Sequence, residues 1–166
     1  MMNCVIFDLD QTLVDSSSLE LDRKERNWSK VYSKLDQLKP YPNIHNVIET
    51  LCFRGYKIGV VSNSPKLYCT KLITAMGIKV DYVVGYHCTA LKKPMPDPIF
   101  FCINQLGSGF DNIFGIGDNK NDIISYKNAN IKSIGCLWGN SDNSKLYSSN
   151  PDYLISDPLK ILEILK

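Results

Sequence analysis

The sequence has no excess of either charge, few histidines and no long apolar run. Its 19 Lys and Arg against 17 Asp and Glu leave a net charge of +2 over 166 residues. A nearly neutral chain carries no clear signal for binding nucleic acid or a membrane surface. No apolar stretch approaches the roughly 20 residues that a membrane-spanning helix needs. We therefore expect a cytoplasmic protein with neither a membrane span nor a nucleic-acid signature.

Cysteine is present, but not in a pattern that binds zinc or forms a disulfide framework. The six cysteines form no Cys-x-x-Cys pair and lie in apolar segments such as NCVIF and SIGCLW. Buried, reduced thiols are the simplest interpretation. The chain also opens on a strand pattern rather than on a charged and then apolar signal sequence.

Short apolar runs alternate with helical patterns along most of the chain. The continuous apolar character of the runs is typical of strands that are covered on both faces. The sequence predicts a three-layer, doubly wound (Rossmann-like) α/β fold with a parallel sheet and helices on both faces. The expected strands are residues 4–9, 57–62, 81–85, 112–117, 131–138 and 152–155. Ser-Pro or Asp-Pro pairs at 64–65, 97–98 and 157–158 predict helix starts, with the proline as the first helical residue.

The length predicts one domain, residues 1–166, with one irregular segment. Residues 16–39 interrupt the alternation and carry many charges, with Trp28, Val31 and Leu35 among apolar residues at helical spacing. We expect a small helical, cap-like insert here. Whether it packs as a solvated helix or covers a site as a lid stays open.

Carboxylates follow two of the predicted strands. Asp8 and Asp10 end the first, and side chains at i and i+2 leave a strand on the same face. Asp118 and Asp122 follow the strand at 112–117, close enough to share a face where the next helix begins. Because ligands bind at the carboxyl ends of parallel strands, these groups should meet. Such oxygen ligands bind Mg²⁺, which would also relieve the repulsion between the aspartates.

Hydroxyl, amide and ammonium groups follow the strands between them. Ser62 and Asn63 end the second strand, and Lys93 comes after the third. Together with the carboxylates, these groups suit phosphoryl transfer. One aspartate can attack phosphorus, a second can donate a proton to the leaving oxygen and then activate water, and Lys93 can neutralise the phosphate.

Four segments in this order, FDLDQTLVDS, VVSNSP, KPMPDP and GIGDNKND, resemble the motifs of the haloacid dehalogenase (HAD) superfamily of phosphatases, in its phosphoglycolate-phosphatase-like branch. Asp8 then resembles the nucleophile and a metal ligand. Asp10 resembles the general acid/base, whose backbone carbonyl also binds the metal. Asp118 resembles the acidic metal ligand, and Asp122 binds the metal directly or through water.

The resemblance also implies that Ser62, Asn63 and Lys93 bind phosphate. The sequence departs from the family pattern in two ways. Gln11 stands where many relatives have glycine, and the chain between the motifs is too short for a full helical cap domain. The expected function is hydrolysis of a phosphomonoester through an aspartyl-phosphate, with Mg²⁺ as cofactor and a small phosphorylated metabolite as substrate.

Two alternatives remain at this point. One is a phosphatase acting on a macromolecular phosphate, either a nucleic-acid end or a phosphoprotein. The other is a catalytically weak phosphate-binding or scaffolding protein with the same fold. The sequence also leaves open whether a homodimer partner covers the site.

Overall fold

The computed structural model describes residues 2–140 and 142–166 and contains a six-stranded sheet. The strand order is β5-β4-β1-β6-β7-β8, and each neighbouring pair is parallel. This arrangement confirms the predicted doubly wound fold class. The strands are β1 (Asn3–Phe7), β4 (Lys57–Val61), β5 (Tyr82–Val84), β6 (Asn112–Gly117), β7 (Lys132–Cys136) and β8 (Tyr153–Ile155).

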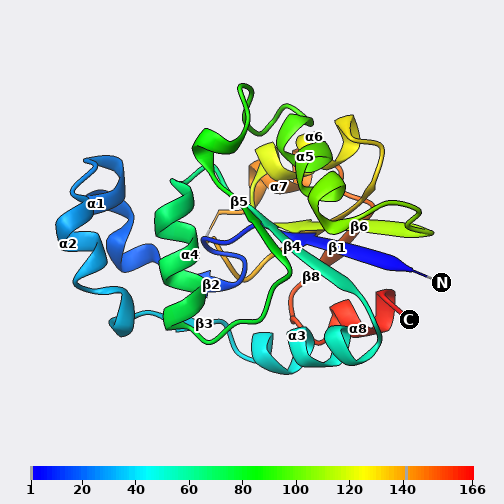
Figure 1. Ribbon diagram of the computed structural model, residues 1–166, viewed down its shortest axis with the longest axis horizontal. Coiled ribbons are helices and arrows are strands. Elements are labelled where there is room, and N and C mark those ends of the chain that lie inside the picture. Colours follow the sequence, from blue (N-terminus) through cyan, green and yellow to red (C-terminus); the bar gives the residue numbers. More distant parts are fainter. Residues whose placement is uncertain (1, 141) are drawn as a thin grey trace.

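Helices cover both faces of the sheet, because successive side chains of each strand point to opposite sides. Val5 and Phe7 belong to one apolar cluster, and Cys4 and Ile6 belong to the other. In Figure 1, α3 and α8 lie below the sheet and α5 and α6 lie above it. The first cluster includes residues of α3 (Ile44–Phe53), α4 (Lys66–Ala75) and α8 (Lys160–Ile164), and the second includes residues of α5 (Asp97–Leu106), α6 (Lys120–Asn128) and α7 (Ser144–Ser148).

One glycine in β6 sets how closely α6 approaches the sheet. A Cβ at Gly115 would lie 2.3 Å from the ring of Tyr126, so only glycine leaves room for that side chain. The Tyr126 hydroxyl donates a hydrogen bond to the carbonyl oxygen of Ile116 at 3.0 Å. This contact fixes the position of α6 against the sheet, and α6 carries Asp122.

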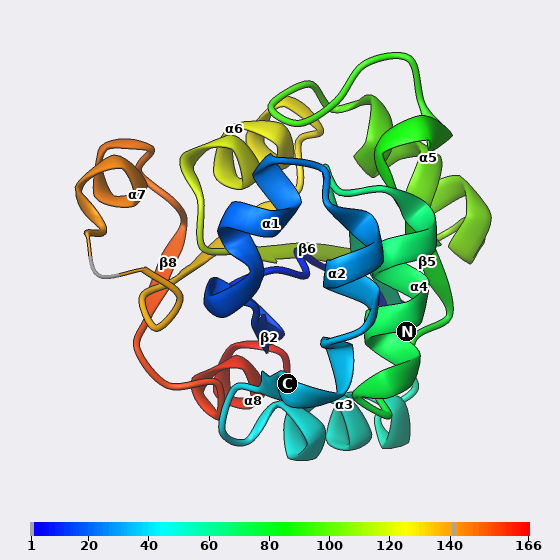
Figure 2. The same ribbon diagram turned by 90° about the vertical axis from the view of Figure 1, so that its left-hand side faces the viewer.

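The segment 16–39 forms short helices beyond the carboxyl ends of the strands. Figure 2, which looks onto that end of the sheet, shows α1 and α2 in front of the strands. Val31 and Leu35 are buried, and the ring centroid of Trp28 lies 5.8 Å from that of Tyr68 on α4. We call residues 16–39 the insert. The division of the chain into a single domain, 1–166, with this segment as a cap-like insert stays a prediction. The insert contains η1 (Ser17–Leu19), α1 (Glu20–Lys24), α2 (Trp28–Tyr32) and η2 (Leu35–Gln37), between the paired antiparallel strands β2 (Val14–Asp15) and β3 (Lys39–Pro40).

The predicted helix starts are wrong by one or two residues. The helices begin at Lys66, Asp97 and Lys160 rather than at the prolines. Ser64 makes no capping bond to α4; its hydroxyl donates instead to Asp10, at 3.1 Å. Within residues 2–140 and 142–166, no helix is long and apolar enough to cross a membrane.

Candidate active site

The carboxyl ends of three neighbouring strands carry the predicted site residues. Asp8 directly follows β1, Ser62 follows β4 and Asp118 follows β6. Because β4, β1 and β6 are parallel neighbours, these ends meet at one edge of the sheet. The cleft there has a volume of about 330 Å³, and every predicted site residue lines it: Asp8, Asp10, Ser62, Asn63, Lys93, Asp118 and Asp122.

Lys93 lies at the centre of this cleft, with its side chain only 3% exposed. Its ammonium donates to Asp8 Oδ1 at 2.7 Å, to Asp122 Oδ1 at 2.6 Å and to the carbonyl oxygen of Val61 at 2.8 Å. The side-chain amide of Asn63 donates to the carbonyl of Lys93 at 3.0 Å and accepts from its N–H at 3.2 Å. Asn63 therefore helps to place Lys93, in addition to the phosphate contact predicted for it.

The charges in the cleft do not balance. Burial raises the pKa of Asp8 well above its usual value, Lys93 opposes this effect, and Asp122 and Asp118 add to it. Burial, followed by the charge of Asp122, raises the pKa of Asp118 to about 6. Burial disfavours the Lys93 ammonium, but Asp122 and Asp8 outweigh this cost and raise its pKa, so it stays charged. Three buried carboxylates thus share one lysine, an arrangement that favours a further cation.

The donor set fits a hard divalent cation. Asp8, Asp118 and Asp122 each offer an oxygen, and these atoms lie within 4.8 Å of one another. Carboxylate oxygens are the ligands that Mg²⁺ prefers. The excess negative charge of the cluster is the second observation in favour of a cation here.

Neighbouring groups orient the carboxylates. Thr12 Oγ1 donates to Asp118 Oδ1 at 2.9 Å, and the side-chain amide of Asn140 donates to Asp118 Oδ2. Asp122 Oδ2 accepts the backbone N–H of Asn119 at 3.0 Å, while its Oδ1 accepts from Lys93. Both oxygens of Asp122 therefore have partners, as do both oxygens of Asp118, so these contacts orient the two carboxylates without deciding between direct and water-mediated binding by Asp122.

Asp10 is held by four donors. Its Oδ1 accepts from Ser16 Oγ at 2.6 Å and from the Tyr68 hydroxyl at 2.7 Å. Its Oδ2 accepts from Ser64 Oγ at 3.1 Å and forms an ion pair with Arg23 of the insert at 2.8 Å. Burial and the charge of Asp10 raise the pKa of Tyr68, so its hydroxyl remains a donor.

Gln11 adopts the left-handed backbone conformation, with a φ of 64°. Glycine adopts this conformation at the lowest cost, which explains why the family pattern has glycine where this chain has Gln11. The Gln11 side chain accepts from the Tyr41 hydroxyl at 3.0 Å and from the N–H of Ser16 at 3.3 Å. These contacts anchor the side chain beside the start of the insert.

Arg23, Tyr68 and Asn140 also contact the carboxylates of the site, and they were not predicted from the sequence. Tyr68 lies in the first turn of α4, directly after the strand end that carries Ser62, and a hydroxyl at such a place could have been counted among the candidates. Arg23 is one of many charged residues of the insert and Asn140 one of several Asn residues near the C-terminal end of the sheet, and no local signal in the sequence distinguishes either.

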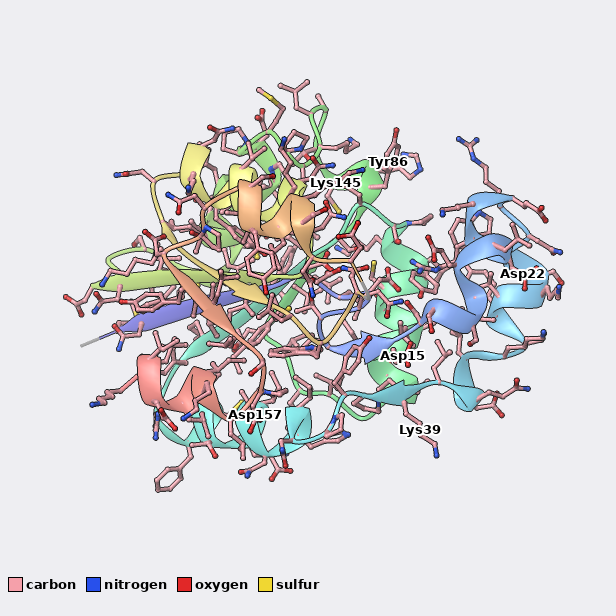
Figure 3. The ribbon with its side chains drawn as sticks, turned by 180° about the vertical axis from the view of Figure 1, so that it is seen from behind. Asp15, Asp22, Lys39, Tyr86, Lys145 and Asp157 are labelled. Atoms are coloured by element: carbon pink, nitrogen blue, oxygen red, sulfur yellow. The ribbon has the colours of Figure 1, made fainter. Side chains whose placement is uncertain are left out.

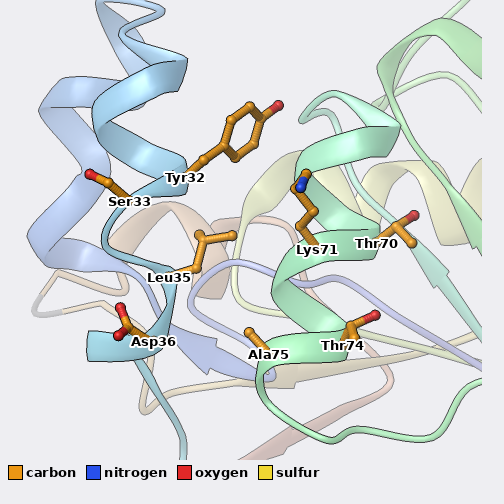
Figure 4. A pocket seen from close by; sticks show the side chains of 8 residues that line it. All are labelled: Tyr32, Ser33, Leu35, Asp36, Thr70, Lys71, Thr74 and Ala75. Carbon is orange, nitrogen blue, oxygen red and sulfur yellow. The ribbon is translucent and has the colours of Figure 1, made fainter.

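A separate cavity of about 540 Å³ lies between the insert and α4. Its lining comes from α2 and η2 on one side and from α4 on the other (Figure 4). The ammonium of Lys71 lies 5.6 Å from the ring centroid of Tyr32 there. Neither Asp8 nor Asp10 lines this cavity, so it marks the joint between insert and core rather than the reaction site.

A family model described as haloacid dehalogenase-like hydrolase matches residues 20–136, more than half of the chain. The chain belongs to this family. The matched range begins after Asp8 and Asp10, so the roles of these residues in this HAD protein stay predictions.

Relatives and solved structures agree with the family. A phosphoglycolate phosphatase from Haemophilus influenzae is 32% identical over 127 residues, which are 75% of this chain and 57% of that protein. The chain thus spans little more than half the length of that relative. A pyrophosphatase, PpaX, from Oceanobacillus iheyensis is 24% identical over 97% of this chain and 95% of its own.

The fold is shared with proteins of lower identity. A predicted phosphoglycolate phosphatase from Haemophilus somnus has a TM-score of 0.85 at 23% identity and covers 99% of this chain and 98% of its own. CbbY from Rhodobacter sphaeroides, in complex with phosphate, has a TM-score of 0.80 at 13% identity, covering 97% and 96%. These likenesses support the HAD fold and leave the substrate undetermined.

Proposed function

We propose that the chain is a magnesium-dependent phosphomonoester hydrolase that acts on a small phosphorylated metabolite through an aspartyl-phosphate on Asp8. The observation that carries the proposal is the ammonium of Lys93, held between the carboxylates of Asp8 and Asp122 at 2.7 and 2.6 Å. A positive group fixed beside a buried nucleophile draws phosphate oxygens to the place where charge develops in the transition state. The named phosphatases among the relatives support the same reaction class.

Magnesium would be held by Asp8, Asp118 and the backbone carbonyl of Asp10, with Asp122 acting directly or through water. When bound, it supplies positive charge that balances the carboxylates and the phosphate. Ser62 and the Asn63 segment line the same cleft and would contact the remaining phosphate oxygens.

The reaction then has two steps. A carboxylate oxygen of Asp8 attacks phosphorus, the bond to the leaving oxygen breaks, and Asp10 donates a proton to that oxygen. In the second step Asp10 takes a proton from water, whose oxygen attacks phosphorus, releasing inorganic phosphate and restoring Asp8. Because four donors hold Asp10, at least one must give way before Asp10 reaches the leaving oxygen. Ser16 and Arg23 are the two donors that come from the insert, so movement of the insert would release them.

The test is hydrolysis of p-nitrophenyl phosphate. Wild-type protein should release phosphate with Mg²⁺ and lose this activity in EDTA, and Asp8→Asn should be inactive because the amide is a poor nucleophile. Asp15→Asn is the matched control, because Asp15 is exposed on β2 and lies outside the cleft. Turnover retained in Asp8→Asn at the level of the control would refute the mechanism.

A further inference from the structure

A second cavity, of about 720 Å³, adjoins the catalytic cleft. The two share part of their lining, including Arg23, Asn63 and Ser64. Its other walls come from the insert on one side and from η3 (Tyr86–Cys88) on the other. Figure 3 shows Tyr86 near α4, with Asp22 on α1 across from it. A phosphate bound at Asp8 would therefore leave the rest of its molecule room to extend into this cavity, which we call the leaving-group pocket.

The leaving-group pocket is positively charged. Arg23, Lys24 and Arg26 line it, together with one carboxylate, Glu20. Lys24 pairs with Glu20 at 2.5 Å, and Arg23 pairs with Asp10. Arg26 forms no ion pair with any residue that the structure describes. Arg26 thus leaves one positive charge in excess of the paired carboxylates, and a recess lined mainly by one sign of charge concentrates ligands of the opposite sign.

Arg23 carries an unmet hydrogen bond at the junction of the two cavities. Its guanidinium donates to Asp10 and to Ser16 Oγ, yet its buried Nε has no acceptor among the described residues. Buried donors are nearly always satisfied in folded proteins, so an unsatisfied one points to a missing partner. An anionic group of the ligand would supply that acceptor once the Arg23 side chain turns from Asp10 toward the pocket, which exposes the Nε atom.

The volume of the pocket sets the size of its occupant. Pockets of roughly 300–1,000 Å³ hold ligands of drug or nucleotide size, and a two-carbon acid would fill only a small part of this one. A large leaving group fits the space that lies between the insert and η3.

We propose that the leaving-group pocket takes a large leaving group that carries a second anionic group, either a carboxylate or a phosphate, bound by Arg23 and Arg26. This inference rests on the proposed function, because it names the substrate class of the same site. The substrate is then a phosphate monoester with two separated anionic groups, of sugar-acid, sugar-bisphosphate or nucleotide size.

Matched substrate pairs test this charge preference. Glucose 6-phosphate against 6-phosphogluconate adds a carboxylate, and fructose 6-phosphate against fructose 1,6-bisphosphate adds a phosphate. Wild-type protein should have a higher kcat/KM for the member that carries the additional anionic group in at least one pair, and the responding pair identifies that group. Arg26→Asn should lower the ratio of kcat/KM with the additional anionic group to kcat/KM without it about tenfold or more, the scale of a hydrogen bond to a charged group.

The backbone conformation of Arg26 decides which substitutions are suitable as tests. Arg26 has a φ of 57°, a left-handed conformation that asparagine tolerates, so Arg26→Asn removes the charge with little strain. Arg26→Lys should restore most of the ratio. Lys79→Gln is the control, because this exposed lysine precedes β5 at the end of the sheet opposite to the site, and it should leave the ratio unchanged.

A binding measurement separates this inference from the proposed function. Trp28 lines the pocket, so its fluorescence should respond to 6-phosphogluconate or fructose 1,6-bisphosphate in the Asp8→Asn variant, where turnover is blocked. Anion-selective binding that depends on Arg26 supports the pocket even if wild-type protein hydrolyses nothing. Equal kcat/KM and equal binding for both members of both pairs, or an unchanged ratio in Arg26→Asn, would overturn it even if p-nitrophenyl phosphate is hydrolysed.

Discussion

Replacing Lys93 by methionine tests how the buried charges of the site are balanced. Methionine is unbranched and fills much of the same space, but it carries no charge. The substitution leaves Asp8 and Asp122 without the ammonium that now lies 2.7 and 2.6 Å from them. Removing one partner of a buried ion pair costs about 3–5 kcal/mol, because the remaining charge is buried without compensation. We expect Lys93→Met to lose that much unfolding free energy at pH 7.5 without Mg²⁺.

The loss should depend on pH. Without Lys93, the folded-state pKa of Asp8 rises further above the value of 3.8 that it has in an unfolded chain. The folded state then binds more protons than the unfolded state above pH 4, so its stability falls as pH rises through this window. The deficit of Lys93→Met relative to wild type should therefore shrink at pH 5.5. Only well below pH 3.8 is Asp8 protonated in both states, and there its contribution to the deficit vanishes.

Urea unfolding followed by tryptophan fluorescence measures this difference. Lys92→Met is the matched control, because the half-buried Lys92 donates only to the backbone carbonyls of Thr89 and Ala90. We expect the control to stay within about 1 kcal/mol of wild type. The reasoning is refuted if Lys93→Met is as stable as Lys92→Met at pH 7.5, or if its deficit grows on acidification.

Two further predictions concern the metal and the packing of α6. Because metal ligands must be ionised and the pKa of Asp118 is about 6 without metal, protons should compete with Mg²⁺ below pH 6. In a thermal-shift assay, Mg²⁺ should thus raise the Tm at pH 7.5 but much less at pH 5. Equal shifts at the two pH values, or a shift retained in Asp118→Asn, would contradict this. Gly115→Ala places a Cβ 2.3 Å from the ring of Tyr126 and should cost about 1–3 kcal/mol in urea unfolding. In the double variant Gly115→Ala with Tyr126→Leu, the loss of unfolding free energy should be smaller than the sum of the losses of the two single variants. A loss equal to that sum would contradict this contact.

The sheet and most of the cleft were predictable because parallel strands impose a regular geometry. Asp8, Ser62 and Asp118 each follow a continuous apolar run, and adjacent strand ends must meet at one edge. The observed parallel sheet confirms the predicted fold class. The catalytic and metal-binding roles of these residues stay predictions.

The contacts around Asp10 were not predictable in the same way. Arg23 reaches Asp10 only because the insert lies over the end of the sheet, a placement set by tertiary packing. Asn140 lies in a stretch rich in Ser and Asn, where nothing in the local sequence indicates that its side chain donates to Asp118. At the start of α4, the Ser64 hydroxyl donates to Asp10 rather than capping the helix, a tertiary contact that the local sequence does not indicate.

Trapping the phosphorylated enzyme tests the central claim most directly. Wild-type protein, mixed with Mg²⁺ and p-nitrophenyl phosphate and quenched in acid, would be digested and analysed by mass spectrometry. We predict a phosphate adduct on the peptide that contains Asp8. The adduct should disappear in Asp8→Asn and persist in Asp15→Asn. Turnover without any such adduct, or an adduct located on another residue, would contradict the account.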